Sequence, residues 1–319
     1  MNGKDASNTL HTIMLIAALA LLSAFVGFVL GGRIGLVTAV LLSAFGLAAG
    51  SKASAGLVLR MYKAKLIHPQ QAPEIYAIYN ELCRRAELSP YPKLYYIPTK
   101  MPNAFAVGTG DASAVAITDG IIRTMTPREL AGIMAHEITH VRCRDTSVLG
   151  LADIFTRTIS AMSRVGLLMM FFSFSSFFGN SAFSFWSVGL ILFFSPTVAI
   201  MLQLALSRTR EFNADRGAAE LTGDAHGLAS ALRKIDRLAQ GGFLRRIFGP
   251  GMRRQQPAML RTHPPTEDRV AALLEFAAEL QSSQPLPAEI VPQQRRIAPA
   301  NQPRVRFGQK YHFLSGIWR

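Results

Sequence analysis

Four long apolar segments divide the chain, and polar segments lie between and after them. The first runs from Ile13 to Leu30 without a charged residue, and the second, Ile34 to Gly50, follows the short break Gly31-Gly32-Arg33. The third is Val165 to Phe178, and the fourth, Trp186 to Leu206, contains no charge. Because about 20 apolar residues in a helix cross a bilayer, we predict four transmembrane helices arranged as two hairpins.

Two of these segments have alternative interpretations. A cleaved signal peptide would also explain the first, but Asp5 beside Lys4 and the second apolar segment favour an uncleaved hairpin. The third is short, and its helix could begin in Leu149 to Ala161; two charged residues of that stretch and a third just after it fall on one face. We expect that helix to leave the soluble part with a polar face and then enter the bilayer. A functional charge cluster within the membrane and a re-entrant second hairpin remain open. The charged residues are Asp153, Arg157 and Arg164.

The distribution of charge predicts the orientation. The formal net charge is +14, which suits either nucleic acid or an anionic membrane surface. The apolar segments favour the membrane. The sequence lacks the alternation of aromatic and basic residues that would indicate RNA binding. Basic residues gather after the second and fourth segments, so both termini and the polar segments are predicted to be cytoplasmic. The two cysteines, Cys83 and Cys143, form no disulfide framework, as expected in that compartment.

The polar segment between the second and third apolar segments is typical of a small α+β module. Pro73 to Ala86 has helical spacing of apolar residues. Three short strands are predicted after it, followed by a turn at Asp119-Gly120. The strands are Lys93 to Ile97, Ala104 to Gly108 and Ala112 to Thr118.

His136-Glu137-Ile138-Thr139-His140 indicates a metal site with a base beside it. Positions i and i+4 of a helix share a face, so both imidazoles can reach one ion. Zinc accepts imidazole nitrogen, and Glu137 can take a proton from an attacking water. Thr126-Pro127-Arg128-Glu129 is a capping box that predicts a helix start upstream. Cys143 lies about 10 Å beyond His136 on a continuing helix, so we interpret it as a packing residue.

A third protein ligand is expected for a catalytic zinc, and the best candidates follow the fourth apolar segment. Glu211 and Asp215 are again i and i+4, so one carboxylate can bind the metal while the other orients a ligand. A solvated helix with Arg–Glu pairs next to the membrane is the alternative. The predicted topology returns this segment to the side that holds His136.

These motifs together resemble peptidase family M48, the integral-membrane zinc metallopeptidases. The resemblance covers residues 10–275 and includes 136–140, two apolar segments, and then Ser207 to Asp215. Two further motifs fit the family: 103–108 (NAFAVG) and 262–266 (THPPT). The four-span plan is closer to the HtpX-like bacterial heat-shock proteases than to the seven-span CaaX prenyl proteases.

The resemblance implies a mainly α fold with a small β-sheet, in which a zincin-like α+β catalytic domain is attached to four transmembrane helices. It also implies one Zn²⁺ per chain, bound by His136, His140 and Glu211, with Glu137 as the general base. Asp215 would fix a zinc-bound histidine, Asn103 would lie on the edge strand that receives the substrate backbone, and His263 would sit near the substrate carbonyl. From the residues alone, Asn103 could equally be a turn residue and His263 a loop residue.

We therefore expect a membrane-anchored zinc endopeptidase in the bacterial inner membrane, acting at its cytoplasmic surface on damaged or misfolded membrane proteins, and no nucleic-acid partner. A CaaX-type processing protease and a zinc-binding scaffold without proteolytic activity are the alternatives. The expected parts are an N-terminal hairpin (1–52), the first part of the catalytic domain (53–148), a second hairpin (149–206), the second part of the catalytic domain (207–280) and a basic flexible tail (281–319).

Overall fold

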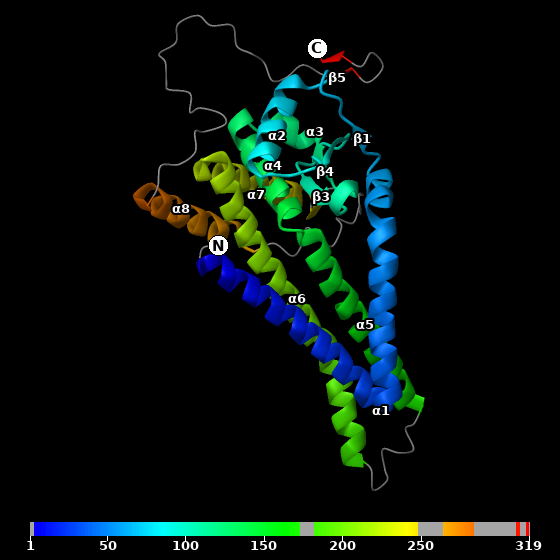
Figure 1. Ribbon diagram of the computed structural model, residues 1–319. Helices are drawn as coiled ribbons and strands as arrows, with labels where there is room; N and C mark the ends of the chain where they lie inside the picture. Colours follow the sequence, from blue (N-terminus) through cyan, green and yellow to red (C-terminus); the bar gives the residue numbers. More distant parts are fainter. Residues whose placement is uncertain (1–2, 173–181, 248–263, 284–310, 313–316, 319) are drawn as a thin grey trace, which may run out of the picture. The chain divides into compact units, whose positions relative to one another are not determined.

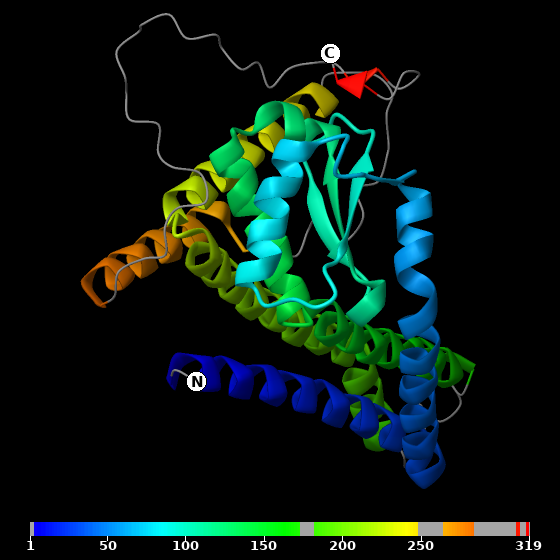
Figure 2. The same ribbon diagram turned by 45° about the horizontal axis from the view of Figure 1, so that its top comes forward.

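The computed structural model describes residues 3–172, 182–247, 264–283, 311–312 and 317–318, and these are mainly helical with one four-stranded sheet (Figures 1 and 2). The chain divides into two compact units. One comprises Met1–Ser54 and Thr146–Arg210, and the other Ala55–Asp145 and Glu211–Arg319. The prediction of a mainly α chain with a small sheet is confirmed.

In the first unit, α1 (Gly3–Met61) consists of two helices joined at a kink. Gly31 and Gly32 have non-helical backbone angles, and Gly32 has a φ of 56°, which favours glycine. Next to the kink the two helices are in contact through one glycine from each side of it. A Cβ added to Gly27 would lie 2.5 Å from the carbonyl oxygen of Gly35. The predicted break between the first two apolar segments is confirmed.

The other helices of this unit are α5 (Asp145–Phe172) and most of α6 (Ala182–Thr222). Since α5 begins at Asp145, it starts well before the third apolar segment. Within the described residues, two stretches are long and apolar enough to cross a membrane: Thr9–Gly46, which contains the kink, and Trp186–Thr222. Four transmembrane helices are not confirmed, and residues 173–178 of the third segment lie outside the described part.

A serine pair joins α5 to α6 in the interior of the first unit. Ser163 Oγ lies 2.9 Å from Ser195 Oγ, and Ser195 Oγ donates to the carbonyl of Leu192 at 3.4 Å. Pro196 follows directly and has no N–H for that carbonyl, so the serine hydroxyl takes the place of the missing donor. On another face of α5, Arg157 pairs with Asp153 and is 79% exposed, so the predicted polar face is present.

The second unit is built on a mixed sheet in the order β1-β2-β4-β3. β2 and β4 are parallel, and the other two pairs are antiparallel. The three predicted strands are confirmed, the second and third with slightly shorter bounds. The strands are β1 (Lys65–Leu66), β2 (Lys93–Ile97), β3 (Ala104–Val107) and β4 (Ala114–Thr118).

The two faces of this sheet bury different clusters. On one face, Leu94, Val115 and Ile117 join the main core with apolar residues of α2, α4, α7, α8 and the end of α6. On the other face, Ala114 and Ala116 pack with the C-terminal end of α1. The β-strand alternation of the sequence accounts for this division. The helices are α2 (Pro73–Arg85), α4 (Pro127–Arg142), α7 (Ala225–Ile247) and α8 (Thr266–Ser283).

The predicted turn at Asp119-Gly120 is wrong, because these residues begin the short helix α3 (Asp119–Thr124). Thr118 caps it by accepting a hydrogen bond from the backbone N–H of Ile121. Gly120 serves close packing, since a Cβ there would lie 2.7 Å from the backbone of Pro102. The remaining short elements are η1 (Gly110–Ala112), β5 (Tyr311–His312) and β6 (Ile317–Trp318), of which the last two pair within the segment predicted as a tail.

Candidate metal centre

Helix α4 carries the HExxH motif and is fastened at its N-terminal end. The predicted capping box is confirmed: Thr126 accepts from the backbone of Glu129, and the Glu129 carboxylate accepts from the backbone of Thr126 at 2.8 Å. The same carboxylate accepts from Ser230 Oγ at 2.8 Å and from Lys234 Nζ at 2.9 Å, both on α7. This end of α4 is thus a closed polar network, and it fixes the helix against α7.

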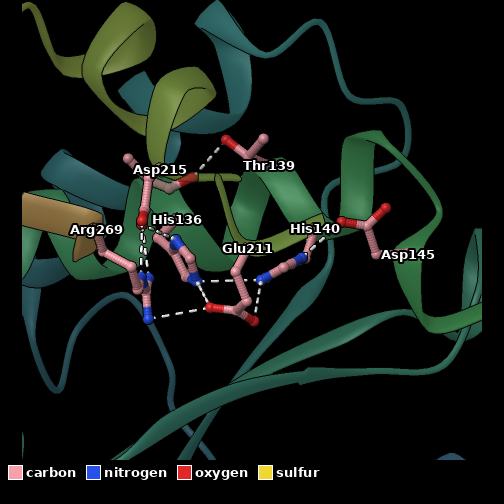
Figure 3. A network of polar contacts seen from close by, with 8 residues as sticks. His136, Thr139, His140, Asp145, Glu211, Asp215 and Arg269 are labelled. Atoms are coloured by element: carbon pink, nitrogen blue, oxygen red, sulfur yellow. Dashed lines mark hydrogen bonds and ion pairs between the residues drawn. The ribbon is translucent and has the colours of Figure 1, made fainter. Parts of the chain in front are cut away.

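At the other end of α4, the imidazoles of His136 and His140 face each other (Figure 3). Their Nε2 atoms are 3.1 Å apart. Each Nδ1 lies against a carboxylate: that of His136 is 3.0 Å from Asp215 Oδ1, and that of His140 is 2.6 Å from Asp145 Oδ2. These contacts favour a proton at each Nδ1, so the two Nε2 lone pairs point at one place, where either a metal ion or a single proton can lie between them.

Glu211, on α6, closes this group. Its Oε2 lies 3.6 Å from His136 Nε2 and its Oε1 lies 3.6 Å from His140 Nε2. One ligand atom from each of the three residues falls within 4.8 Å of the others. Tetrahedral ligands at the usual zinc–nitrogen length are about 3.3 Å apart, close to the observed separation of the two nitrogens. The donor set therefore fits a small divalent metal such as zinc.

Close packing brings α6 against α4 at this point. Gly217 faces Thr139, and a Cβ at position 217 would lie 2.5 Å from Thr139 Cγ2. Thr139 cannot turn aside easily, because it is buried and its hydroxyl donates to the carbonyl of Ala135 at 2.8 Å. The missing side chain therefore lets α6 present Glu211 and Asp215 to the histidines of α4.

The surroundings of His140 favour its charged form in the absence of a metal. Burial lowers the pKa of His140, but the hydrogen bond from Nδ1 to Asp145 and the charges of Glu137 and Glu211 raise it above its ordinary value. A bound cation would occupy the Nε2 position that this proton takes, so metal and proton compete for the same lone pair.

Two residues of this network were missed by the sequence reasoning. Asp145 is the first residue of α5 and only 1% exposed, and it reaches His140 because Arg144, at a φ of 54°, turns the chain sharply between α4 and α5. Arg269 of α8 is 6% exposed and contacts both Asp215 and Glu211. Arg269 could have been suspected because it is a charged residue shortly after the 262–266 motif. The residues around Asp145 in the sequence gave no comparable indication.

The remaining predicted residues are placed as follows. Glu137 is 9% exposed, and within the described residues its carboxylate makes no hydrogen bond or ion pair, so it is available to water. Cys143 caps the end of α4 and is not part of the His-His-Glu group. His263 lies outside the described residues. Asn103 directly precedes β3.

The edge strand β3 presents specific backbone groups to its free side. Asn103 faces β4, because its N–H donates to Thr118 Oγ1 and its carbonyl accepts from the N–H of Thr118. In an antiparallel ladder, successive residues turn alternately toward and away from the partner strand. From the register of β3 with β4, the backbone groups of Ala104 and Ala106 therefore point outward.

The sequence profile of peptidase family M48 matches residues 69–277, which include all residues of this centre. The chain belongs to peptidase family M48. It is 39% identical over 293 residues to a protease HtpX homologue of Methylibium petroleiphilum, covering 84% of this chain and 97% of that protein. It is also 36% identical to the Salinibacter ruber homologue (86% and 100%) and 37% identical to that of Burkholderia thailandensis (85% and 97%).

This membership shows that the protein is an HtpX-like, membrane-anchored metallopeptidase that acts on polypeptides. The alternatives of a scaffold and of a CaaX-type processing enzyme are not favoured. Among solved structures, the crystal structure of Ste24p from S. mikatae aligns with 85% of this chain and 65% of that chain, with a TM-score of 0.45 and 17% identity.

Proposed function

We propose that the protein is a zinc-dependent endopeptidase in which His136, His140 and Glu211 bind the metal. The observation that carries this proposal is the convergence of two Nε2 atoms 3.1 Å apart with the two oxygens of Glu211, each 3.6 Å from one of them, while each Nδ1 lies against a carboxylate. A metal ion there relieves the repulsion between the two lone pairs, as the proton on His140 does in its absence. The donor set of two imidazoles and one carboxylate is one that catalytic zinc uses.

The chain's own residues then divide the chemistry. A bound zinc would polarise the scissile carbonyl and lower the pKa of the attacking water. Glu137 accepts the proton of that water and later donates it to the leaving amine. Its charge contributes to raising the pKa of His140 and of Arg269, which supports a position beside the proposed ligands. Asp145 and Asp215 keep the two imidazoles in the tautomer that leaves Nε2 free.

An extended substrate segment would lie along β3 and pair with the outward backbone groups of Ala104 and Ala106. Asn103 would contact the substrate through its side chain and not through its backbone, because its backbone groups face β4. For His263, a position near the substrate carbonyl rests on the family resemblance alone. Backbone pairing would make recognition depend on an extended conformation more than on particular side chains.

We further propose that the chain crosses the bacterial inner membrane several times as two hairpins. Both termini and the catalytic parts would then lie in the cytoplasm. The glycine kink in α1 and the basic residues that follow the apolar segments support it. The parts proposed from the sequence, 1–52, 53–148, 149–206, 207–280 and 281–319, fit this plan. Damaged or misfolded membrane proteins are the proposed substrates, as the family resemblance implies and as the position of Glu211 shortly after the fourth apolar segment supports.

The test replaces Glu137 by Gln in the full-length protein, purified in detergent. We expect bound zinc to stay at one equivalent, while cleavage of a casein substrate falls by about 10³-fold, since general acid–base catalysis contributes about that much. Glu220→Gln is the matched control, because Glu220 is a 42% exposed residue of α6 that pairs with Arg216. It should keep both zinc and activity.

Cleavage by Glu137→Gln at the wild-type rate would show that another group is the base. Wild-type protein that contains no zinc, or that regains full activity only with a different metal, would refute the zinc assignment.

A further inference from the structure

Arg269 is a buried cation that holds two carboxylates of α6 at once (Figure 3). Its Nε and Nη2 donate to the two carboxylate oxygens of Asp215 at 2.7 and 2.6 Å. Its Nη1 lies 3.0 Å from Glu211 Oε2. The side chains of Arg269, Glu211 and Asp215 are 7%, 6% and 3% exposed, so these contacts are shielded from water. The guanidinium therefore connects the carboxylate on His136 to the candidate third ligand.

The contact with Arg269 makes the two oxygens of Glu211 inequivalent. Each oxygen lies 3.6 Å from one Nε2, Oε2 from that of His136 and Oε1 from that of His140, but Oε2 also lies 3.0 Å from the guanidinium. A carboxylate can bind a metal through one oxygen or through both. A guanidinium presents its donors in a rigid planar fork, and the bidentate pair with Asp215 fixes the direction in which Nη1 points. Glu211 cannot rotate to offer Oε2 elsewhere without losing that charged contact.

We propose that Arg269 is a positioning residue that retains Oε2 of Glu211 and so limits Glu211 to a single metal bond through Oε1. This inference rests on the proposed function, in which Glu211 is the third metal ligand. A catalytic zinc needs one position for water. The second oxygen of Glu211 would add a fifth ligand beside that water, so Arg269 keeps the coordination number at four.

An effect of Arg269 on the packing of α8 can be distinguished from its effect on Glu211. A second ion pair also links α8 to its neighbour, because Arg233 of α7 pairs with Glu267 of α8 at 3.0 Å. That pair is exposed at 46% and 70%, whereas the two histidines are 9% and 13% exposed. Arg233→Gln is therefore a matched control, since it removes an arginine–glutamate contact of α8 and leaves the contacts of Glu211 in place.

The experiment uses the full-length protein in detergent, with Co²⁺ as the probe metal. Visible absorption of Co²⁺ is strong in four-coordinate sites and weak in five-coordinate ones. We expect a four-coordinate spectrum for wild type and Arg233→Gln, and a weaker spectrum for Arg269→Gln, as Glu211 binds through both oxygens. Metal affinity of Arg269→Gln should fall by about 10- to 100-fold, as is typical when a group that supports a ligand is lost.

Arg269→Lys provides a second variant, because lysine keeps the buried charge but cannot hold both carboxylates with a planar fork. It should give an intermediate spectrum. An unchanged spectrum in either variant would overturn the inference. If neither variant folds, X-ray absorption of the wild-type zinc form decides: one oxygen of Glu211 at bonding distance supports the inference, and two refute it. Wild type that binds neither metal would instead refute the proposed function.

Discussion

Both ends of α4 carry buried polar groups, but the groups at one end are fully hydrogen-bonded and those at the other end are not. At the N-terminal end, Glu129 accepts from a backbone N–H, a hydroxyl and an ammonium group, so its hydrogen-bonding capacity is used. At the C-terminal end, two Nε2 atoms face each other at 3.1 Å, and Glu137 has no hydrogen-bond partner within the described residues. The closed network stabilises the fold, whereas the open one has capacity left for a metal, a water and a substrate.

The largest effect should follow from removal of the third ligand. Glu211→Ala should lose most of its zinc and, with it, proteolysis, because two imidazoles alone hold the metal weakly. Glu129→Gln, at the closed end of the same helix, should retain one equivalent. Metal analysis after dialysis measures both. Full zinc in Glu211→Ala would require another third ligand, and Asp215 would then be the first candidate.

A smaller loss is expected when the support of one imidazole is removed. Asp145→Asn should weaken zinc binding by about 10- to 100-fold, because the amide no longer holds the proton of His140 at Nδ1 as firmly. Competition with a chromophoric chelator measures the change. Asp111→Asn, an exposed aspartate in η1, serves as the control and should bind zinc like wild type. Equal affinities in the two variants would mean that Asp145 only caps α5.

The contribution of Glu129, at the N-terminal end of α4, to stability should depend on pH and not on metal. Burial raises the pKa of Glu129, but hydrogen bonds from Thr126, Lys234 and Ser230 lower it below its ordinary value. Its stabilising contribution, about 2 kcal/mol for hydrogen bonds to a charged group, is therefore complete above about pH 4.3 and is lost as the pH falls through the folded-state pKa.

Thermal unfolding of the metal-free protein in detergent tests this sign. The melting temperature of wild type should exceed that of Glu129→Gln at pH 6, and the difference should shrink below about pH 4.3. A difference that grows in acid would contradict the assigned direction.

The smallest effect is expected at Cys143. Although it follows His140 by three residues, it caps the end of α4 and lies outside the His-His-Glu group. Cys143→Ser should leave zinc content and proteolysis unchanged, as measured beside Glu211→Ala. A loss of zinc would mean that the metal binds at the end of α4, away from Glu211.

The sequence predicted those features that depend on neighbouring residues. The start of α4 at Thr126 and Pro127 needs only local hydrogen bonds and the fixed φ of proline, and the strands around Val115 follow from alternation. Gly120 was misread as a turn residue, because the reason for a glycine there is contact with the distant backbone at Pro102. Asp145 and Arg269 could not be assigned, since their partners are reached through a chain corner and through the packing of α8.

The corner at Arg144 has a consequence for how the chain can vary. It allows no spare residue between the end of α4 and Asp145, so the histidine and its carboxylate are tied by a fixed interval of five positions in the chain. A single insertion or deletion there would turn α5 by about 100° and carry the carboxylate away from the ring. Length changes in this connection should therefore be rejected, even though it is a surface corner of the kind that elsewhere tolerates them.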